Sequence, residues 1–440
     1  MLNKKILLLF LPLVAFSKVI DFQDTLSLVL ENNMELKAKK LNVDEAKSKL
    51  TKANSYDFGT IIFNENISRS DNPGYVIGSK IASREAQITD LSLDALNGSN
   101  ERTNYETKIS YDIPLFTGFK IDTSKQMAKL QILAQKAKYS FDEKQLELEV
   151  LKAYNGAVVA KEFIEATNKA KETTLYFINL SKKLYNEGLI TDIDVMQSQV
   201  HNLNVDASTQ EAKNKFDLSI AYLQFLTNDI QITDVNNFAK IEIEDSNLQA
   251  LQNKALNYRD DLNFMQLNVK TMKNNIELET SDKYPTIGIH LEYGLNNDNL
   301  NYDTSTQDYY VGAIGIKYTL FDGGLSKSKK QIAKIKYKKA KVYYEYMKQG
   351  INLEVEKNIL TLQAKQKIFE AKEKAVILAK KILKRSKIMY KNYLINMSNL
   401  LTQQTNLQKA RADMIKSKFD VSIAVAKLKL SYGNRLKELK

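Results

Sequence analysis

Two stretches of similar sequence decide the fold: DIPLFTG at residues 112–118 and KYTLFDG at residues 317–323. Each lies between a strand-like run and a long helical pattern, and their phenylalanines, Phe116 and Phe321, are 205 residues apart. Two further pairs of segments share this offset: YNEG (185–188) with YKNY (390–393), and AYLQF (221–225) with AKLKL (426–430). Three matches at one offset indicate an internal duplication.

The duplication predicts the organisation of the chain. Each copy contains a helix, a strand, a loop, a strand, a very long helix, a tight turn and a long helix. Another match, LNV at 41–43 and 267–269, has an offset of 226, which indicates about 21 extra residues between Phe58 and Thr103 in the first copy. The predicted segments are a first repeat (18–226), a linker (227–247), a second repeat (248–433) and a tail (434–440). Alternating isoleucines in the linker, at 230–233 and 241–244, predict short strands.

The N-terminus has the features of a secretory signal peptide. Two lysines precede an apolar run from Ile6 to Phe16, and Ala15, Phe16 and Ser17 form a small-x-small cleavage site. The run is too short to span a bilayer, which takes about 20 helical residues, so we predict that residues 1–17 are removed. No later stretch reaches about 18 uninterrupted apolar residues, so a mature chain that spans a membrane would have to use strands. Cysteine is absent, which excludes disulfides, thiol chemistry and a lipid-modified cysteine.

Four segments alternate apolar and polar residues with the period of a strand. Their predicted bounds are about 59–69, 103–114, 285–296 and 309–321. Strands of about ten residues with tyrosines near their ends are typical of outer-membrane barrels, although a soluble sheet that is buried on one face alternates identically.

The number of strands limits the possible architectures. A barrel needs about eight strands, and an open edge is not tolerated in lipid. Either these strands lie outside a membrane, or several protomers share one barrel, and three protomers would supply twelve strands. The polar loops at 69–103 and 296–308 would then face the outside.

The segment between Phe119 and Asn186 contains no proline and one glycine, which predicts a helix of roughly 65 residues, about 100 Å long. Apolar residues recur at intervals of three and four in both long helices, as in antiparallel coiled coils. The two seams consist of Leu146, Val150, Ala153, Ala157, Ala160 and Ile164, and of Ile368, Ala371, Ala375, Leu378 and Ile382.

Tight turns near 186–194 and 391–399 are predicted to join each long helix to its returning partner. Thr191 and Asn396, which correspond at the offset of 205, are good N-cap residues. Asp194 lies near a capping-box position at the positive end of the helix. Alternatively, symmetry copies of Asp194 form an acidic ring around a pore.

Together these motifs resemble the TolC family of outer-membrane factors over essentially the whole mature chain. The resemblance rests on PLFTG at 114–118, TLFDGG at 319–324, YNEGLITDIDV at 185–195 and YP at 284–285. It implies a mainly α fold with transmembrane β-structure: a homotrimer with a twelve-stranded outer-membrane barrel, in contact with outer-membrane lipid, above a helical barrel of antiparallel coiled coils in the periplasm. The inner end would open when a periplasmic adaptor protein and an inner-membrane pump dock at the helix tips.

The resemblance also implies roles for single residues. It assigns the pore aperture to Asp194, Asn399 and Thr402, and adaptor docking to the tip residues Gly188, Leu189, Tyr393 and Leu394. The second copy departs from the family pattern, because Asn399 and Thr402 are not acids and Tyr393 stands where glycine is usual. One acid in each protomer predicts a weaker cation-selective ring.

The remaining chemistry points away from an enzyme. His201 and His290 lie far apart in sequence without cysteine partners, and the chain has no phosphate-binding glycine loop, so we predict no catalytic, cofactor or metal site. The net charge of +12 comes from lysines interspersed with glutamates on helices, and export disfavours nucleic acid as a partner. A lysine cluster at 327–341 is predicted to be a solvated face or a contact with inner-leaflet phosphates.

Two functions follow from these features. The first is a passive outer-membrane exit duct of a tripartite efflux pump or type I secretion system, for small molecules or secreted proteins. The second is a soluble periplasmic coiled-coil adaptor or scaffold. An adaptor would be expected to have one hairpin beside a compact β-domain, and the duplicated sequence favours the duct.

Overall fold

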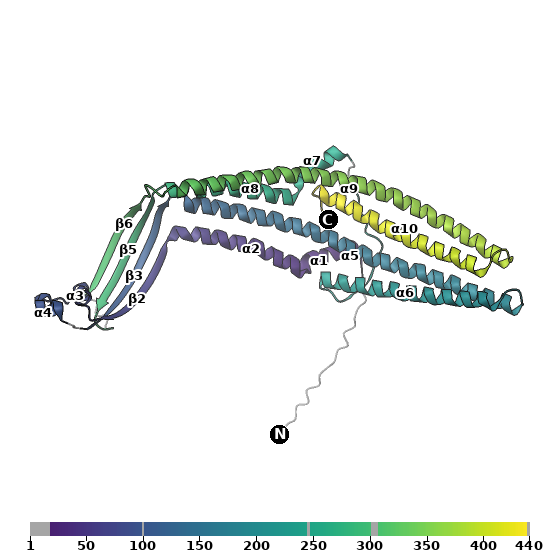
Figure 1. Cartoon of the computed structure of the whole chain (residues 1–440), viewed down its shortest axis with the longest axis horizontal. Helices are drawn as coiled ribbons and strands as arrows, with labels where there is room; N and C mark the ends of the chain where they lie inside the picture. The colour runs from purple at the N-terminus through teal and green to yellow at the C-terminus, as the bar shows by residue number, and fades with distance from the viewer. Residues whose placement is uncertain (1–17, 99–100, 244–246, 301–306, 438–440) are drawn as a thin grey trace, which may run out of the picture. The chain divides into compact units, whose positions relative to one another are not determined.

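The computed structural model describes residues 18–98, 101–243, 247–300 and 307–437 (Figure 1). The predicted signal peptide and residues 438–440 of the predicted tail lie outside these ranges. The chain divides into a helical unit (Met1–Leu41, Ala137–Asn263 and Glu345–Lys440) and a sheet unit (Asn42–Lys136 and Phe264–Tyr344). Within the described ranges, no helix combines the length and the apolar character needed to cross a bilayer.

The predicted tandem duplication is confirmed, and the fold is mainly helical. The first repeat contains α1 (Phe22–Asn32), α2 (Met34–Ser55), β2 (Thr60–Ser70), β3 (Arg102–Thr117), α5 (Lys120–Asn186) and α6 (Asp192–Thr227). The second contains α7 (Leu248–Tyr258), α8 (Asp260–Leu278), β5 (Thr286–Asn297), β6 (Asp308–Lys317), α9 (Leu325–Lys391) and α10 (Met397–Ser431). The long helices α5 and α9 have 67 residues each and begin and end 205 positions apart.

The duplicated motif forms the same turn from strand to helix in both repeats. Gly118 and Gly323 have φ angles of 63° and 67°, and the following residues, Phe119 and Gly324, also have positive φ. Glycine adopts this left-handed region without the clash that a Cβ causes. A Cβ on Gly118 would also lie 2.5 Å from the carbonyl oxygen of Ser281. The backbone geometry therefore explains why this motif is the clearest mark of the repeat.

The single helix predicted before the first strand of each repeat is wrong, because both are broken by one extended residue. These residues are Asn33 and Arg259, with ψ of 124° in each case, and they are 226 positions apart. The Asn33 side chain donates to the carbonyl of Leu226 over 3.3 Å, and the Arg259 side chain donates to that of Ser431 over 3.2 Å. The acceptors are themselves 205 positions apart, so both repeats use the same contact between the helix break and the end of the returning helix.

The sheet has the order β2-β3-β5-β6, and all neighbouring strands are antiparallel. β6 ends at Lys317 instead of about 321, because its last partner is Thr286 and the preceding Pro285 has no N–H for a ladder bond. β3 extends beyond the predicted end to Thr117, with an irregularity between Pro114 and Phe116, a position where proline is tolerated in a sheet.

The predicted loop at 69–103 contains regular structure: α3 (Pro73–Ala82), a 3₁₀ turn (Ile88–Leu91) and α4 (Leu93–Asn97). Asn72 caps α3 by accepting from the N–H groups of Gly74 and Tyr75, and Pro73 occupies the first turn. Asparagine followed by proline is a helix start signal, so the sequence contained this information.

The linker holds one of its two predicted strands. β4 (Ile232–Val235) pairs in parallel with β1 (Lys18–Ile20). Residues 241–243 form no strand, and 244–246 lie outside the described residues.

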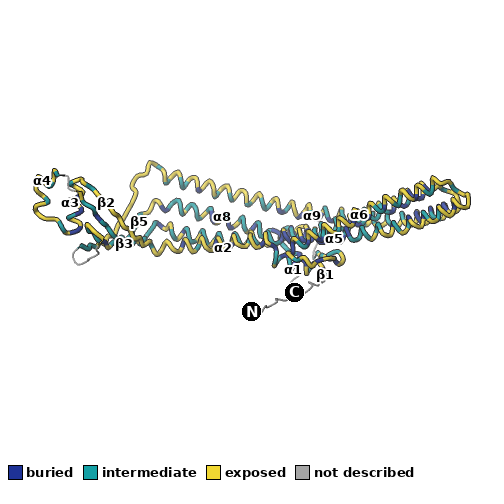
Figure 2. The backbone as a smooth tube through the Cα atoms, turned by 90° about the horizontal axis from the view of Figure 1, so that it is seen from below, coloured by how far each residue is buried: buried dark blue, intermediate teal, exposed yellow. Residues whose placement is uncertain are grey.

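Beside this small sheet lies the main core of the helical unit, where Leu26, Tyr154 and Leu223 are fully buried (Figure 2). The predicted seam on α5 is buried at Leu146, Val150, Ala157 and Ala160.

Candidate functional site

The four-stranded sheet has one apolar and one polar face. The register places on the apolar face a set of large side chains that the chain itself leaves exposed: Ile61, Phe63, Ile67, Ile109, Leu291, Tyr293, Tyr310, Ile314 and Ile316. Exposure reaches 85% at Tyr310 and 71% at Ile314. A continuous apolar surface of this kind marks contact with lipid or protein.

The opposite face carries polar side chains that interact with one another. His290 Nδ1 lies 2.7 Å from Asp112 Oδ1, and the Tyr309 hydroxyl donates to Glu292 over 3.0 Å. Lys108 lies 3.5 Å from the same glutamate. His290 is therefore part of a polar surface, while His201 lies on α6. Among the residues that the structure describes, no group of His, Cys, Asp and Glu could hold a metal ion.

The two hairpin turns of the helical unit have the same backbone geometry. The N–H groups of Leu189 and Leu394 each donate over 2.9 Å to the carbonyl five residues earlier, which is the Schellman pattern. The residue before each leucine adopts the left-handed conformation: Gly188, with φ of 72°, and Tyr393, with φ of 59°. All four turn residues are exposed: Gly188, Leu189, Tyr393 and Leu394. The predicted docking residues therefore form the exposed ends of the two hairpins.

The two hairpins pack together near their turns through one apolar cluster. Its buried members come from α5, α9 and α10: Phe177, Leu184, Leu383, Tyr390, Met397, Leu400, Leu401 and Leu407. Ile190 and Ile395, from the two turns, pack against the cluster. The positions of the turns relative to one another are thus fixed within a single chain.

Asp194 lies at this junction. Thr191 occupies the N-cap position of α6, but its side chain makes no cap hydrogen bond, so Asp194 does not complete a capping box with it. Its carboxylate faces the backbone N–H of Met397 and the hydroxyl of Tyr390, both in the second repeat, although the Tyr390 hydroxyl makes no well-formed hydrogen bond in the described part of the chain. Burial raises the pKa of Asp194, and these two interactions offset only part of that effect. The pKa of Tyr390 is also raised by burial and by the nearby carboxylate.

The corresponding positions of the second repeat differ. Asn396 caps α10, and its side chain accepts from the N–H of Asn399 over 2.9 Å. Asn399, which corresponds to Asp194, is exposed, as is Thr402 one turn later. The structure therefore brings Asp194 together with the second hairpin, whereas Asn399 and Thr402 lie on the exposed surface of α10, where the Thr402 hydroxyl donates to the carbonyl of Ser398 over 2.9 Å. Sequence reasoning missed the partners of Asp194, because no local pattern signals a contact across 200 positions.

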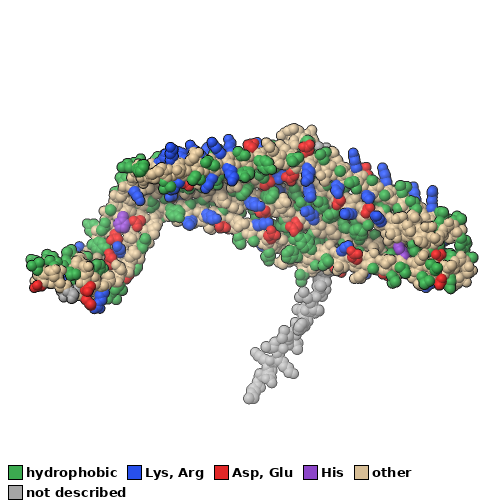
Figure 3. Space-filling model, in the orientation of Figure 1, with side chains coloured by type: hydrophobic (Ala, Val, Ile, Leu, Met, Phe, Trp, Pro, Cys, Tyr) green, Lys and Arg blue, Asp and Glu red, His purple; other side chains and the backbone are tan. Residues whose placement is uncertain are grey.

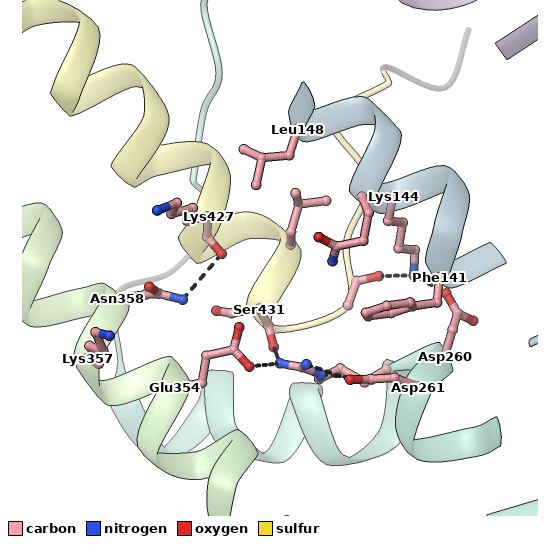
Figure 4. Close-up of a pocket in the computed structure, with 14 residues that line it drawn as sticks. Phe141, Lys144, Leu148, Asp260, Asp261, Glu354, Lys357, Asn358, Lys427 and Ser431 are labelled. Atoms are coloured by element: carbon pink, nitrogen blue, oxygen red, sulfur yellow. Dashed lines mark hydrogen bonds and ion pairs between the residues drawn. The ribbon is translucent and has the colours of Figure 1, made fainter. Parts of the chain in front are cut away.

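A cavity of about 320 Å³ in the helical unit lies near the break at Arg259 (Figure 4). Arg259 donates to Asp261 over 2.7 Å and to Glu354 over 2.6 Å. Lys144 pairs with Asp260 at 2.7 Å. These charges neutralise one another and tie α7, α8 and α9 to the end of α10, which is a structural role that the sequence analysis did not predict.

Lysine side chains line the first part of α9, where Figure 3 shows them in a row. Lys329 pairs with Asp282 at 3.0 Å, and Lys339 lies over the ring of Tyr343. Most of the others are exposed, as expected of a solvated face.

A duplicated set of long helical hairpins with a small sheet that is apolar on one face defines a class of outer-membrane channel proteins. The model of the family described as outer membrane efflux protein matches residues 25–229 and 251–434, one block in each repeat. The chain belongs to this family, whose members are channels of efflux and secretion. It is an outer-membrane protein with a large periplasmic part, and the family is not one of enzymes.

Single relatives agree with this assignment. The chain is 22% identical over 228 residues to the alkaline protease secretion protein AprF of Pseudomonas aeruginosa, over 50% of this chain and 47% of AprF. The matched region thus spans about half the length of this curated relative.

Two solved structures show the same fold. The Campylobacter jejuni CmeC outer membrane channel has a TM-score of 0.78 and 14% identity, over 95% of this chain and 87% of CmeC. The open state of the Neisseria gonorrhoeae MtrE outer membrane channel has a TM-score of 0.75 and 17% identity, over 94% of this chain and 89% of MtrE.

Proposed function

We propose that the chain is one of three identical protomers of a passive exit duct, which serves a tripartite efflux pump or a type I secretion system. The observation that carries this proposal is the sheet. Among the described residues, β2 and β6 are paired on one side only, and the apolar face between them is exposed. A barrel closed by several copies satisfies both strand edges and turns the apolar face to outer-membrane lipid. Three copies give twelve strands, the number that the resemblance to the TolC family implies.

Two rows of exposed apolar residues on the helices support an assembly of several copies. On α6, the row consists of Ile193, Met196, Val200 and Leu203, at spacings of three and four. The predicted seam on α9 is not buried by the chain itself, because Ile368, Leu378 and Ile382 are about half exposed. Apolar rows at this spacing normally pack against another helix, and a second copy supplies one.

The hairpin ends are the proposed inner end of the duct. Leu189, Tyr393 and Leu394 are apolar and exposed there, and with Gly188 they would contact the periplasmic adaptor protein. Asp194, Asn399 and Thr402 would line the aperture, with the inner-membrane pump supplying the energy of transport.

The oligomer is tested directly in isolated outer membranes. We expect an unheated sample to migrate as a trimer that heating converts to the monomer. A cysteine on β2 and another on β6 should cross-link neighbouring protomers, and because the chain has no native cysteine every cross-link reports this edge. Release of the protein as a soluble species by osmotic shock would support the adaptor alternative and exclude the duct.

The aperture is tested by conductance in planar bilayers. If copies of Asp194 form the acidic ring, Asp194→Asn should reduce cation selectivity, while the matched variant Asn399→Asp should increase it. Unchanged selectivity in both variants would exclude these positions from the aperture. Co-purification of the cross-linked duct with an inner-membrane protein would identify the pump partner.

A further inference from the structure

The first repeat carries a folded insertion between its two strands, where the second repeat has a shorter connection. Residues 71–101 connect β2 to β3 and contain α3 and α4, whereas β5 and β6 are joined by residues 298–307. In Figure 1, α3 and α4 lie at the end of the sheet opposite the start of α5. On the proposed function, this is the end of the barrel that faces the outside.

Contacts of the insertion show which face of the sheet it covers. Tyr75 shares a hydrogen bond of 2.5 Å with Ser68 on β2. The Arg102 side chain on β3 donates to Ser83 over 2.9 Å and to Glu85 over 2.5 Å. Gln307, directly before β6, donates to Glu85 over 3.0 Å.

The strand residues in these contacts share one face. Ser68 pairs with Asn104, two positions from Arg102, and this places both on the face of Lys108. Gln307 precedes Tyr309 by two positions, and Tyr309 lies on the same polar face through its partner Gly294. Most contacts of the insertion therefore lie on the polar face. Two ion pairs, Arg84 with Asp308 and Glu101 with Arg69, reach the rim of the apolar face.

The insertion is held as a packed element. Lys80 and Asp90 form an ion pair of 2.6 Å within it, and the side chain of Arg102 is 10% exposed. Val76 and Ser83 are buried. A segment held to β3 by one partly buried ion pair and braced internally by a second keeps its position better than an open polar loop.

We propose that three copies of the insertion narrow the outer exit of the duct and set the largest size of molecule that passes it. This inference rests on the proposed function, because it requires that the polar face lines the channel. A duct narrowed in this way differs from a barrel that is fully open to the outside.

The test uses neighbouring residues of β2 on opposite faces. Asn64→Cys lies on the polar face and Phe63→Cys on the apolar face, in a chain without native cysteine. Both variants are labelled in intact cells with a small maleimide and with a maleimide attached to a polyethylene glycol of several kilodaltons. The measurement is repeated after replacement of residues 71–101 by the sequence of residues 298–307, the connection that the second repeat offers.

With the insertion present, the small reagent should label Asn64→Cys about tenfold faster than the large one, and the replacement should remove this difference. Equal labelling by both reagents before the replacement would overturn the inference while the duct stands. Labelling of Phe63→Cys but not of Asn64→Cys by the small reagent would overturn the duct and the inference together.

The double variant Glu85→Ala and Lys80→Ala loosens the insertion without shortening the chain. It should give an intermediate ratio in samples that still migrate as heat-modifiable trimers, and an unchanged ratio would count against a constriction held by these contacts.

Discussion

The two hairpin turns have the same backbone conformation but different side chains. Both end the long helix with the same hydrogen bonds, but the first has Gly188 at the left-handed position and the second has Tyr393. The first turn contributes Asp194, half-buried against the second hairpin, while the corresponding Asn399 is exposed. Duplication thus preserved the path of the chain, whereas the contacts at each tip became specific to one repeat. Single substitutions can test each of these differences separately.

The largest effect is expected at the apolar cluster between the hairpins. Leu400 is fully buried, whereas Val195, at the same position of the first repeat, is half-buried. Leu400→Ala should cost about 2–5 kcal/mol of local stability through lost burial and a cavity, and Val195→Ala about 1 kcal/mol. Hydrogen exchange of the tip amides measures both, and equal effects would contradict the assigned asymmetry.

The next effect concerns the acceptor that Asp194 supplies. Asp194→Ala removes the acceptor that faces the N–H of Met397 and should destabilise the tip by about 1 kcal/mol. Asp194→Asn keeps an acceptor and avoids a buried charge, so it should change stability little. Asn399→Ala, at the exposed equivalent, is the matched control, and a loss as large as that of Asp194→Ala would show that the loss does not come from the contacts of Asp194. Faster exchange at Met397 reports the loss.

Tyr393 should stabilise its turn less than Gly188 stabilises the first turn. A side chain in the left-handed region costs about 1–2 kcal/mol, so Tyr393→Gly should stabilise the second turn by about 1 kcal/mol and Gly188→Ala should destabilise the first by a similar amount. Thermal unfolding of matched samples measures both. If Tyr393→Gly lowers the melting temperature instead, the tyrosine side chain makes a contact that outweighs its backbone strain.

Much of this architecture could be predicted because its signals are local. The spacing of apolar residues and the absence of proline located α5 and α9, and the strand-to-helix motif located the turn between β3 and α5. The breaks at Asn33 and Arg259 were missed, since the pattern of apolar residues continues through them and the contacts that fix them come from α6 and α10. The position of Asp194 could be predicted, but not its partners, which depend on how one hairpin packs on the other.

The smallest effect is the response of the tip to pH. Burial raises the pKa of Asp194 above its ordinary value of 3.8, so between these two values the packed tip holds a proton that a separated tip has lost. The stability of the contact should therefore fall as pH rises through this window and become level above the raised pKa. Tyr390, the titratable group that faces this carboxylate, has a pKa raised well above neutrality and stays protonated throughout. We expect the amides near Met397 to be better protected at about pH 4 than at about pH 7, after correction for intrinsic exchange, and Asp194→Asn to remove the difference. A difference that persists in Asp194→Asn would assign the pH response to another group.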